Sequence, residues 1–458
     1  MTDVHPDGLP VPQRYLAIAT IVLGVTMAVM DSAIANVALP TIAKDLHTDP
    51  ALSIWIVNGY QLAVTISLLP LAALGDIIGY RRIYIWGLAL FTVASLACAV
   101  SESLPMLAAA RVLQGFGGAG IMSVNSALIR FIYPHARLGR GLSYNTLTVA
   151  VSAAAGPTVA AAILSLGDWP WLFAVNIPFG IVAVVVALRA LPQTPRAKHA
   201  FDIPGALLVA VMFALLIGSI DTFGHGGSPW LFAGELAATV GIGWLMVKRE
   251  EAAASPMLPV DLMRIPIFAL SIGTSICSFA AQMLALVSLP FLLQSELHFT
   301  AVKTGLLITP WPIAIALVSP VAGRLADSYP AGILGAIGLI VFASGLFALA
   351  WLPPHPSLLD IAWRMVLAGV GFGLFQSPNN RAMIGSTPRE RSGGASGMLG
   401  TARLLGQTIG AALVALVFVR MPAHGTVTSL YAGVGFAVLA AAVSSLRLFD
   451  RTGQIAKS

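Results

Sequence analysis

The sequence predicts an all-α polytopic membrane protein with fourteen transmembrane helices. Of its 458 residues 57% are hydrophobic and only 10% are charged, and the mean hydropathy is +0.87, whereas about 25% of the residues of a typical soluble domain are charged. A hydrocarbon core about 30 Å thick is crossed by roughly 20 apolar residues of helix. Fourteen runs of this length, each bounded by charge, Pro or Gly, predict spans at residues 15–39, 51–75, 83–101, 104–129, 141–165, 170–188, 203–220, 228–247, 266–293, 304–323, 331–352, 358–380, 394–419 and 427–446.

These runs fall into a pattern of six, two and six. The first run is too long for the core of a signal peptide and has no small-residue cleavage site beside it, so we expect an uncleaved first span. Two runs, 203–220 and 228–247, lie between the segments LPQTPRAKHA and REEAAASPMLP and have no counterpart elsewhere in the chain. We therefore expect a six-helix bundle at 1–192, a linker with two extra helices at 193–256, and a second six-helix bundle at 257–458.

An internal repeat supports this division. LPLAALGDIIG, from Leu69, resembles SPVAGRLADSYP, from Ser319, at an offset of 251 residues, and QGFGGAGIMSVN, from Gln114, aligns with AGVGFGLFQSPN, from Ala368, at an offset of 254. Two parallel halves of six spans are an architecture of secondary transporters, in which cargo binds near the midplane between the halves. The matched pairs are Asp76 with Asp327, Gly115 with Gly369, Gly117 with Gly371, and Asn125 with Asn379.

The basic residues indicate the orientation of the spans. If the N-terminus is cytoplasmic, 19 of the 25 Lys and Arg residues face the cytoplasm. Only Lys44, Lys303 and Arg420 lie outside, and the remaining three, Arg111, Arg364 and Arg403, lie within spans. This asymmetry predicts both termini in the cytoplasm and a location in the inner (cytoplasmic) membrane. Because the positive charges are spread over loop ends, the net charge of +6 does not indicate nucleic-acid binding.

One acidic residue, Asp31, lies inside a run that is otherwise free of charge from Tyr15 to Leu39. A charged carboxylate at such a depth costs at least about 2.5 to 3.5 kcal/mol and calls for a partner or a wet cavity. At 1.5 Å per residue, Asp31 and Arg111 lie roughly 12 and 11 Å below the outer membrane surface. We therefore expect these two residues to pair, in a polar layer with Asn58, Gln61 and Gln114 that faces the path of the cargo.

With these motifs located, the chain resembles the fourteen-helix drug/proton antiporters of the major facilitator superfamily over nearly its whole length. MDSAIANVALP is similar to the acidic signature of their first span, and RVLQGFGGAG to their fourth-span motif. LGDIIGYRR is similar to the loop pattern that follows the second span, although Ala72 and Tyr80 depart from that pattern. AAAGPTVAAA resembles the antiporter motif through Gly156 and Pro157, although Ala160 and Ala161 stand where Gly-Gly is usual.

The resemblance implies roles for these motifs. Residues of the loop motif, together with the repeat residue Asp327, would form a cytoplasmic gate, with Asp76 facing the second half. Topology-setting charge explains the two arginines equally well. Gly156 and Pro157 would bend the fifth span and favour exchange, or would form an ordinary kink. The expected gate residues are Asp76, Gly79, Arg81, Arg82 and Asp327.

We therefore predict a proton-coupled antiporter that exports lipophilic, cationic drugs or dyes by alternating access, with Asp31 binding protons and cargo in turn. A static ion pair between Asp31 and Arg111 and the export of an endogenous metabolite stay open as alternatives. Glu235 is a further candidate acid. A mixture of polar, aromatic and Met side chains suggests a cargo cavity, with core or lipid-facing packing as the alternative for each residue. The candidates are Met27, Asn58, Gln61, Gln114, Phe279, Met283, Trp311, Phe375 and Gln376.

Other classes of function are disfavoured. All eight His residues are assigned to loops or tails without ligand spacing, and the sequence has no nucleotide-binding loop of the type G-x-x-x-x-G-K-[ST]. We therefore expect no enzyme activity and no metal or cofactor. We further expect a monomeric transporter that is driven by the proton gradient. A passive channel is also disfavoured, because it would need a ring of repeated filter groups, whereas one acid opposite one arginine is asymmetric.

Overall fold

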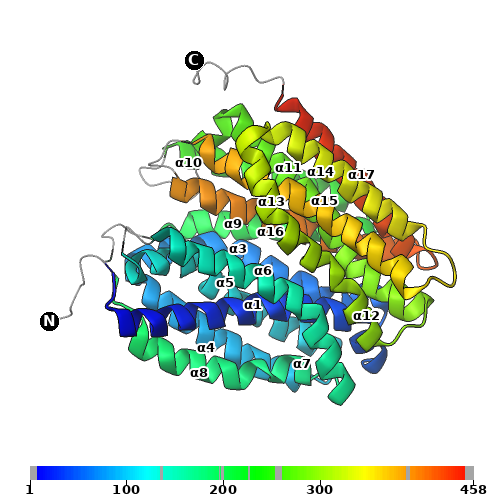
Figure 1. Ribbon diagram of the computed structural model, residues 1–458, viewed down its shortest axis with the longest axis horizontal. Coiled ribbons are helices and arrows are strands. Elements are labelled where there is room, and N and C mark those ends of the chain that lie inside the picture. Colours follow the sequence, from blue (N-terminus) through cyan, green and yellow to red (C-terminus); the bar gives the residue numbers. More distant parts are fainter. Residues whose placement is uncertain are drawn as a thin grey trace. The chain divides into compact units, whose positions relative to one another are not determined.

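A computed structural model of the chain describes residues 8–134, 138–194, 196, 201–224, 227–252, 260–387 and 392–448. Every regular element within these ranges is a helix (Figure 1). Among the described residues, fourteen helices or helix pairs are long and apolar enough to cross a membrane. The sequence-based prediction of an all-α protein with fourteen spans is thereby confirmed.

The chain divides into two compact units. Unit 1 comprises Met1–Asp49 and Trp55–Phe213, and unit 2 comprises Pro50–Ile54 and Ala214–Ser458. The boundary falls inside α9 (Ile203–Gly224), the first of the two extra helices. The division predicted from the sequence, with a separate linker at 193–256, stays a prediction.

Unit 1 is a bundle in which α1 lies against α5, α6 and α8, while α5 packs along α3 and α4 (Figure 1). Local sequence explains several helix ends. Proline, which the first turn of a helix tolerates, starts α1 and α5, and Gly79 joins α3 to α4 with a φ of 102° that favours glycine. The helices of unit 1 are α1 (Val11–Asp45), α3 (Trp55–Ile78), α4 (Tyr80–Ala99), α5 (Leu104–Ile132), α6 (Leu138–Leu166), α7 (Trp171–Ala174) and α8 (Asn176–Ala190).

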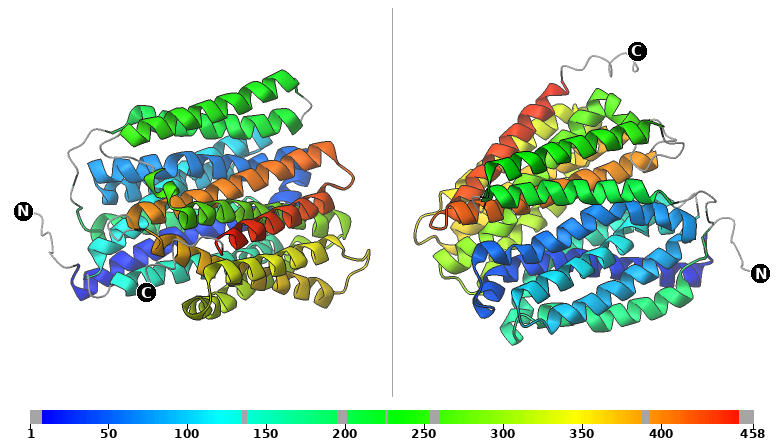
Figure 2. Two further views of the ribbon diagram at one scale, coloured as in Figure 1. Left: turned by 90° about the horizontal axis from the view of Figure 1, so that it is seen from above. Right: turned by 180° about the vertical axis from the view of Figure 1, so that it is seen from behind.

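Unit 2 repeats much of this packing. α15 lies along α13 and α14, and α11 lies along α16 and α17; Figure 2 shows α17, in red, beside the yellow α14. Ser357 caps α15 by accepting the N–H of Asp360, and Thr300 caps α12 in the same way. The helices are α2 (Pro50–Ser53), α10 (Pro229–Ala252), η2 (Val260–Arg264), α11 (Pro266–Phe291), η3 (Leu292–Glu296), α12 (Ala301–Ile308), α13 (Pro310–Ser328), α14 (Ala331–Ala350), α15 (Leu358–Gly385), α16 (Ser392–Arg420) and α17 (Gly425–Leu446).

Candidate functional site

The carboxylate of Asp31 lies in the interior of unit 1, with its side chain only 1% exposed. Arg111, on α5, donates a hydrogen bond from Nη1 to Asp31 Oδ2, which forms the ion pair predicted from helix depth. Gln114, one turn further along α5, donates from Nε2 to Asp31 Oδ1 at 2.9 Å and accepts from Arg111 Nη1 at 2.6 Å. The pair is therefore part of a network that holds α1 against α5.

A third donor to Asp31 was missed by the sequence analysis. Asn176, the first residue of α8, donates from Nδ2 to Asp31 Oδ1 at 2.9 Å. It stands six residues into the predicted sixth span, inside WPWLFAVNIPFG, so the depth calculation applied to Arg111 would have placed it near the same level. Because Asp31 accepts from donors on two further helices, its position depends on how α1, α5 and α8 pack together.

Arg111 is enclosed by more than its carboxylate partner. Its Nε donates to the carbonyl of Ile56 at 3.1 Å, and its Cζ lies 4.4 Å from the ring centroid of Tyr60 and 5.5 Å from that of Phe173. A guanidinium over aromatic faces gains cation–π attraction, which is strongest where water is excluded. The buried guanidinium of Arg111 is therefore held by a carboxylate, a backbone carbonyl and two aromatic rings.

The predicted polar layer lies inside unit 1. Gln114 extends the network to Ser95 on α4, whose hydroxyl accepts from Nε2 at 2.9 Å, whereas Asn58 Oδ1 is buried without a hydrogen-bond partner. Each side chain of the layer is at most 4% exposed, so in this conformation the layer is part of the packed interior and does not form an open surface. The layer consists of Asp31, Asn58, Gln61, Arg111 and Gln114.

The antiporter motif packs against the helix that carries the acid. A Cβ atom on Gly156 would lie 2.4 Å from Cβ of Ala33, only two residues from Asp31. The helix α6 continues through Pro157, and Ser152 Oγ donates to Thr26 Oγ1 at 3.2 Å. The glycine thus permits a close approach of α6 to α1 beside the ion pair.

The loop motif between α3 and α4 is held within unit 1. The hydroxyl of Tyr80 donates to the Asp76 carboxylate, and the N–H of Tyr80 donates to Thr194 Oγ1 at 3.0 Å. Tyr80, which departs from the family loop pattern, therefore supplies a polar partner for Asp76. The side chain of Asp327, the repeat counterpart on α13, lies outside the described part of the structure.

The cargo-cavity candidates lie mostly in the packed interiors of the two units. Phe279, Trp311 and Phe375 belong to an aromatic cluster in unit 2, in which Phe372 lies 5.3 Å from Phe279 and 5.8 Å from Phe375 between ring centroids. Met27 and Met283 are buried, and only Gln376 among the nine candidates is partly exposed. These buried positions agree with the core-packing alternative, and the cargo cavity stays a prediction.

Two further ionisable residues occupy different settings in unit 2. Glu235 lies on α10, and its Oε2 is buried without a hydrogen-bond partner. Arg364 instead pairs with Asp360, four residues earlier on α15, and donates to the carbonyl of Trp351. Arg364 is therefore the partner of a carboxylate on its own helix.

Comparison with known proteins identifies the family. The family model described as Major Facilitator Superfamily matches residues 21–411 and, in a second match, residues 270–454. The chain belongs to this superfamily. Its fourteen spans agree with the fourteen-helix group that the motifs resemble.

Similar proteins are named as transporters. The chain is 58% identical over 450 residues to the "Uncharacterized transporter YebQ" of Escherichia coli (strain K12), which covers 98% of both chains. It is 28% identical to the "Riboflavin transporter RibZ" of Clostridioides difficile (strain 630), covering 89% of each chain. It is 31% identical to the "Multidrug resistance protein Stp" of Mycobacterium tuberculosis (strain ATCC 25618 / H37Rv), covering 86% of this chain and 74% of that protein.

A solved structure agrees in fold. The bacterial homologue of the human lysosomal transporter Spinster, in an inward-facing and unoccupied conformation, matches with a TM-score of 0.68 at 17% identity, covering 96% of this chain and 97% of that one. Family, relatives and fold together identify the chain as a multi-pass membrane transporter of the major facilitator type.

Proposed function

We propose that the chain is a proton-coupled antiporter of the cytoplasmic membrane that exports small lipophilic molecules, with lipophilic cations as the preferred cargo. The observation that carries the proposal is Asp31, a carboxylate buried in a membrane span with Arg111, Gln114 and Asn176 as its donors. Ionisable residues inside membrane spans mark proton and substrate pathways. Relatives named for multidrug resistance support the cargo class.

The contacts of Asp31 suggest how coupling operates. All three neighbours are hydrogen-bond donors, which suit an ionised, acceptor-only carboxylate. A proton or a cationic cargo can reach the carboxylate only when these donors withdraw, and each donor lies on a helix other than α1. A rearrangement of α1 against α5 and α8 during alternating access would therefore expose Asp31 to proton and cargo in turn.

The driving force is the proton gradient. Its electrical part supplies about 2.3 kcal/mol per charge for each 100 mV. With both termini in the cytoplasm, as the distribution of basic residues favours, protons enter from outside and displace cargo that was loaded inside. The pairing of Gly156 with Ala33 beside Asp31 would transmit movement of α6 to this site.

The test is proton-driven efflux of a cationic dye from vesicles that contain the purified protein. Asp31→Asn should abolish efflux driven by a pH gradient, whereas Asp360→Asn, which removes the ion pair with Arg364, should leave it nearly intact. Because a lone buried Arg111 could impair folding, the double variant Asp31→Asn, Arg111→Gln removes both charges. Undiminished pH-driven efflux in either Asp31 variant would remove this residue from the mechanism.

A second candidate is the export of an endogenous metabolite. It is favoured by the relative named as a riboflavin transporter and by the pairing of Asp31 with Arg111, which leaves this carboxylate without uncompensated charge to select cations. A growth-protection panel of cationic dyes, neutral antibiotics and flavins separates the two. Protection against the dyes alone supports the first candidate, and dye sensitivity equal to that of cells without the transporter supports the second.

A further inference from the structure

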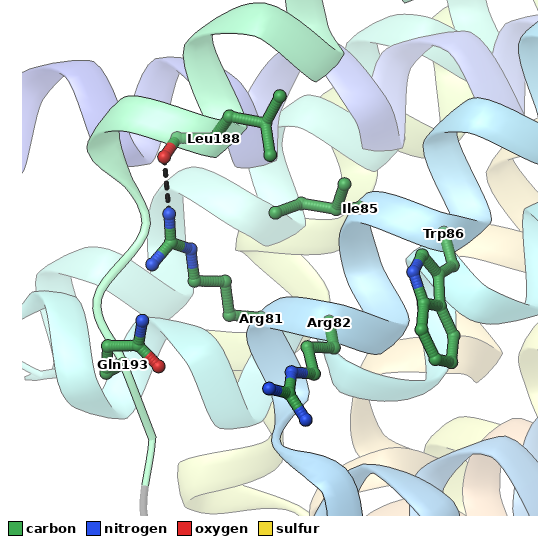
Figure 3. Close-up of a pocket in the computed structure, with 6 residues that line it drawn as sticks. All are labelled: Arg81, Arg82, Ile85, Trp86, Leu188 and Gln193. Atoms are coloured by element: carbon green, nitrogen blue, oxygen red, sulfur yellow. Dashed lines mark hydrogen bonds between the residues drawn. The ribbon is translucent and has the colours of Figure 1, made fainter.

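A pocket at the start of α4 in unit 1 has no part in the mechanism above. It has a volume of about 210 Å³ and opens to the surface. Figure 3 shows Arg81 and Arg82 leaving adjacent positions at the helix start, Gln193 on the chain that follows α8, and Trp86 one turn further along α4. The lining residues are Arg81, Arg82, Ile85, Trp86, Leu188 and Gln193.

The polar end of this pocket carries uncompensated positive charge. Arg81 and Arg82 lie in the first turn of α4, which contains no acidic residue, and the N-terminal end of a helix is itself positive. Arg81 uses one N–H group for the carbonyl of Leu188, and within the described part of the chain neither guanidinium forms an ion pair. Two adjacent cations at a positive helix end favour a bound anion.

The other end of the pocket is apolar and faces outward. Trp86 is 60% exposed and Leu188 is 52% exposed, although both lie on membrane-spanning helices. Exposed apolar side chains on such helices meet lipid, and tryptophan is enriched where acyl chains meet headgroups. A soluble anion would make no use of this surface, whereas a phospholipid has a phosphate for the arginines and acyl chains for Trp86 and Leu188.

We propose that this pocket binds the phosphate headgroup of an anionic phospholipid from the leaflet that the basic loops face. Arg82 and the free N–H groups of Arg81 contact the phosphate, Gln193 donates to the glycerol or phosphate oxygens, and Trp86 packs on the upper acyl chain. Basic pockets between spans on the cytoplasmic side are suited to such headgroups. The bound lipid joins the start of α4 to the end of α8, where Arg81 already contacts the carbonyl of Leu188.

The experiment is native mass spectrometry of the purified full-length chain, titrated with phosphatidylglycerol or with phosphatidylcholine. Wild-type protein should retain phosphatidylglycerol in preference to phosphatidylcholine. Arg82→Gln, which removes an exposed guanidinium with no hydrogen bond in the described structure, should weaken phosphatidylglycerol retention about fivefold, as expected for one cation near an anionic lipid surface. Arg324→Gln, an exposed arginine of unit 2, is the matched control and should leave retention unchanged.

Two further measurements distinguish a lipid site from a site for any small anion. Trp86→Ala should weaken phosphatidylglycerol retention while the protein elutes as folded material, because the acyl-chain contact is lost. Inorganic phosphate at millimolar concentration should not displace the lipid. Displacement by inorganic phosphate, or equal losses in Arg82→Gln and Arg324→Gln, would overturn the proposal in favour of a general anion site or of net charge alone.

Discussion

The two units use the same backbone packing around different interiors. In unit 1 a Cβ atom on Gly117 would lie 2.5 Å from the backbone N of Phe91, and in unit 2 a Cβ atom on Gly371 would lie 2.2 Å from that of Phe342. Likewise, a Cβ atom on Gly115 would lie 2.6 Å from the carbonyl oxygen of Tyr60, and a Cβ atom on Gly369 would lie 2.4 Å from that of Trp311. The internal repeat inferred from the sequence is therefore present as a repeated contact between helices.

The side chains beside this contact differ completely. Unit 1 places Arg111 and Gln114 next to the glycines, whereas an offset of 254 residues leads to Met365 and Ala368 in unit 2, both fully buried. The nearby Trp311, Phe342 and Phe372 form an edge-to-face aromatic cluster. The shared backbone packing therefore does not require a buried charge, and among the described residues the fully buried carboxylate, Asp31, belongs to unit 1.

The largest expected loss of stability comes from replacing Arg111 of unit 1 by methionine, the residue at the matching position of unit 2. Arg111→Met leaves Asp31 as a buried carboxylate without its cation, which should lower the stability by about 3–5 kcal/mol. Arg364→Met breaks the more exposed pair with Asp360 and should lower the stability much less than Arg111→Met does. Unfolding midpoints in detergent, followed by tryptophan fluorescence, measure both variants.

A second substitution identifies the cause of that loss. If stranded charge is responsible, Asp31→Asn in the Arg111→Met background should recover most of the lost stability. Equal losses in Arg111→Met and Arg364→Met, or no recovery in the double variant, would mean that the interior of unit 1 does not depend on its charges.

The sequence was sufficient for features that depend on length and depth. Spans follow from run length, the repeat from spacing, and the pairing of Asp31 with Arg111 from their common level in the membrane. Rotation of a helix about its axis is not fixed by depth, and this explains the missed donor Asn176. Because the rotation of a helix is not known from its sequence, an apolar residue such as Trp311 is compatible with a cavity wall or with the core. The structure places Trp311 in the core of unit 2.

The loop between α3 and α4 shows another limit of pattern reading. From the sequence, Tyr80 is recognised only as a departure from the family loop pattern. In the structure the tyrosine hydroxyl donates to Asp76, and its backbone N–H donates to Thr194, more than a hundred residues away. A contact of such sequence separation depends on tertiary packing, which no local motif encodes.

Replacing the matched glycines by alanine should cause an intermediate loss of stability that is equal in the two units. Gly117→Ala and Gly371→Ala both force a methyl group against backbone atoms closer than 3 Å, and each should lower stability by about 1–3 kcal/mol. Gly273→Ala is the control, because its nearest neighbour is Val443 Cγ1 at 3.7 Å. That change should be neutral or stabilise the helix by up to about 1 kcal/mol.

The same unfolding assay tests this equality. A clear loss in one glycine variant and none in the other would show that the repeated contact is tight in only one unit. The two units would then differ in their backbone packing as well as in their side chains.

The smallest expected effect concerns a buried arginine of unit 2, Arg447, that has no carboxylate partner among the described residues. Arg447, 7% exposed, donates to Ser444 Oγ at 2.9 Å, to Ser271 Oγ at 3.2 Å and to Thr274 Oγ1 at 3.3 Å, while its Nε is buried without a partner. Arg447→Gln strands no opposite charge, so it should cost only about 1 kcal/mol, in contrast to Arg111→Met. A loss of 3–5 kcal/mol would contradict this contrast between the two guanidinium groups.

The difference in stability between wild type and Arg447→Gln should also depend on pH. Burial lowers the pKa of Arg447 to about 10, so above about pH 10 the folded protein releases this proton while the unfolded chain still binds it. Stability must then rise with pH through this group, since the unfolded state holds more protons. In unfolding experiments at about pH 9 and about pH 11, wild type should gain relative to Arg447→Gln at the higher value. A constant difference between the two proteins would show that the guanidinium is solvated like a surface arginine.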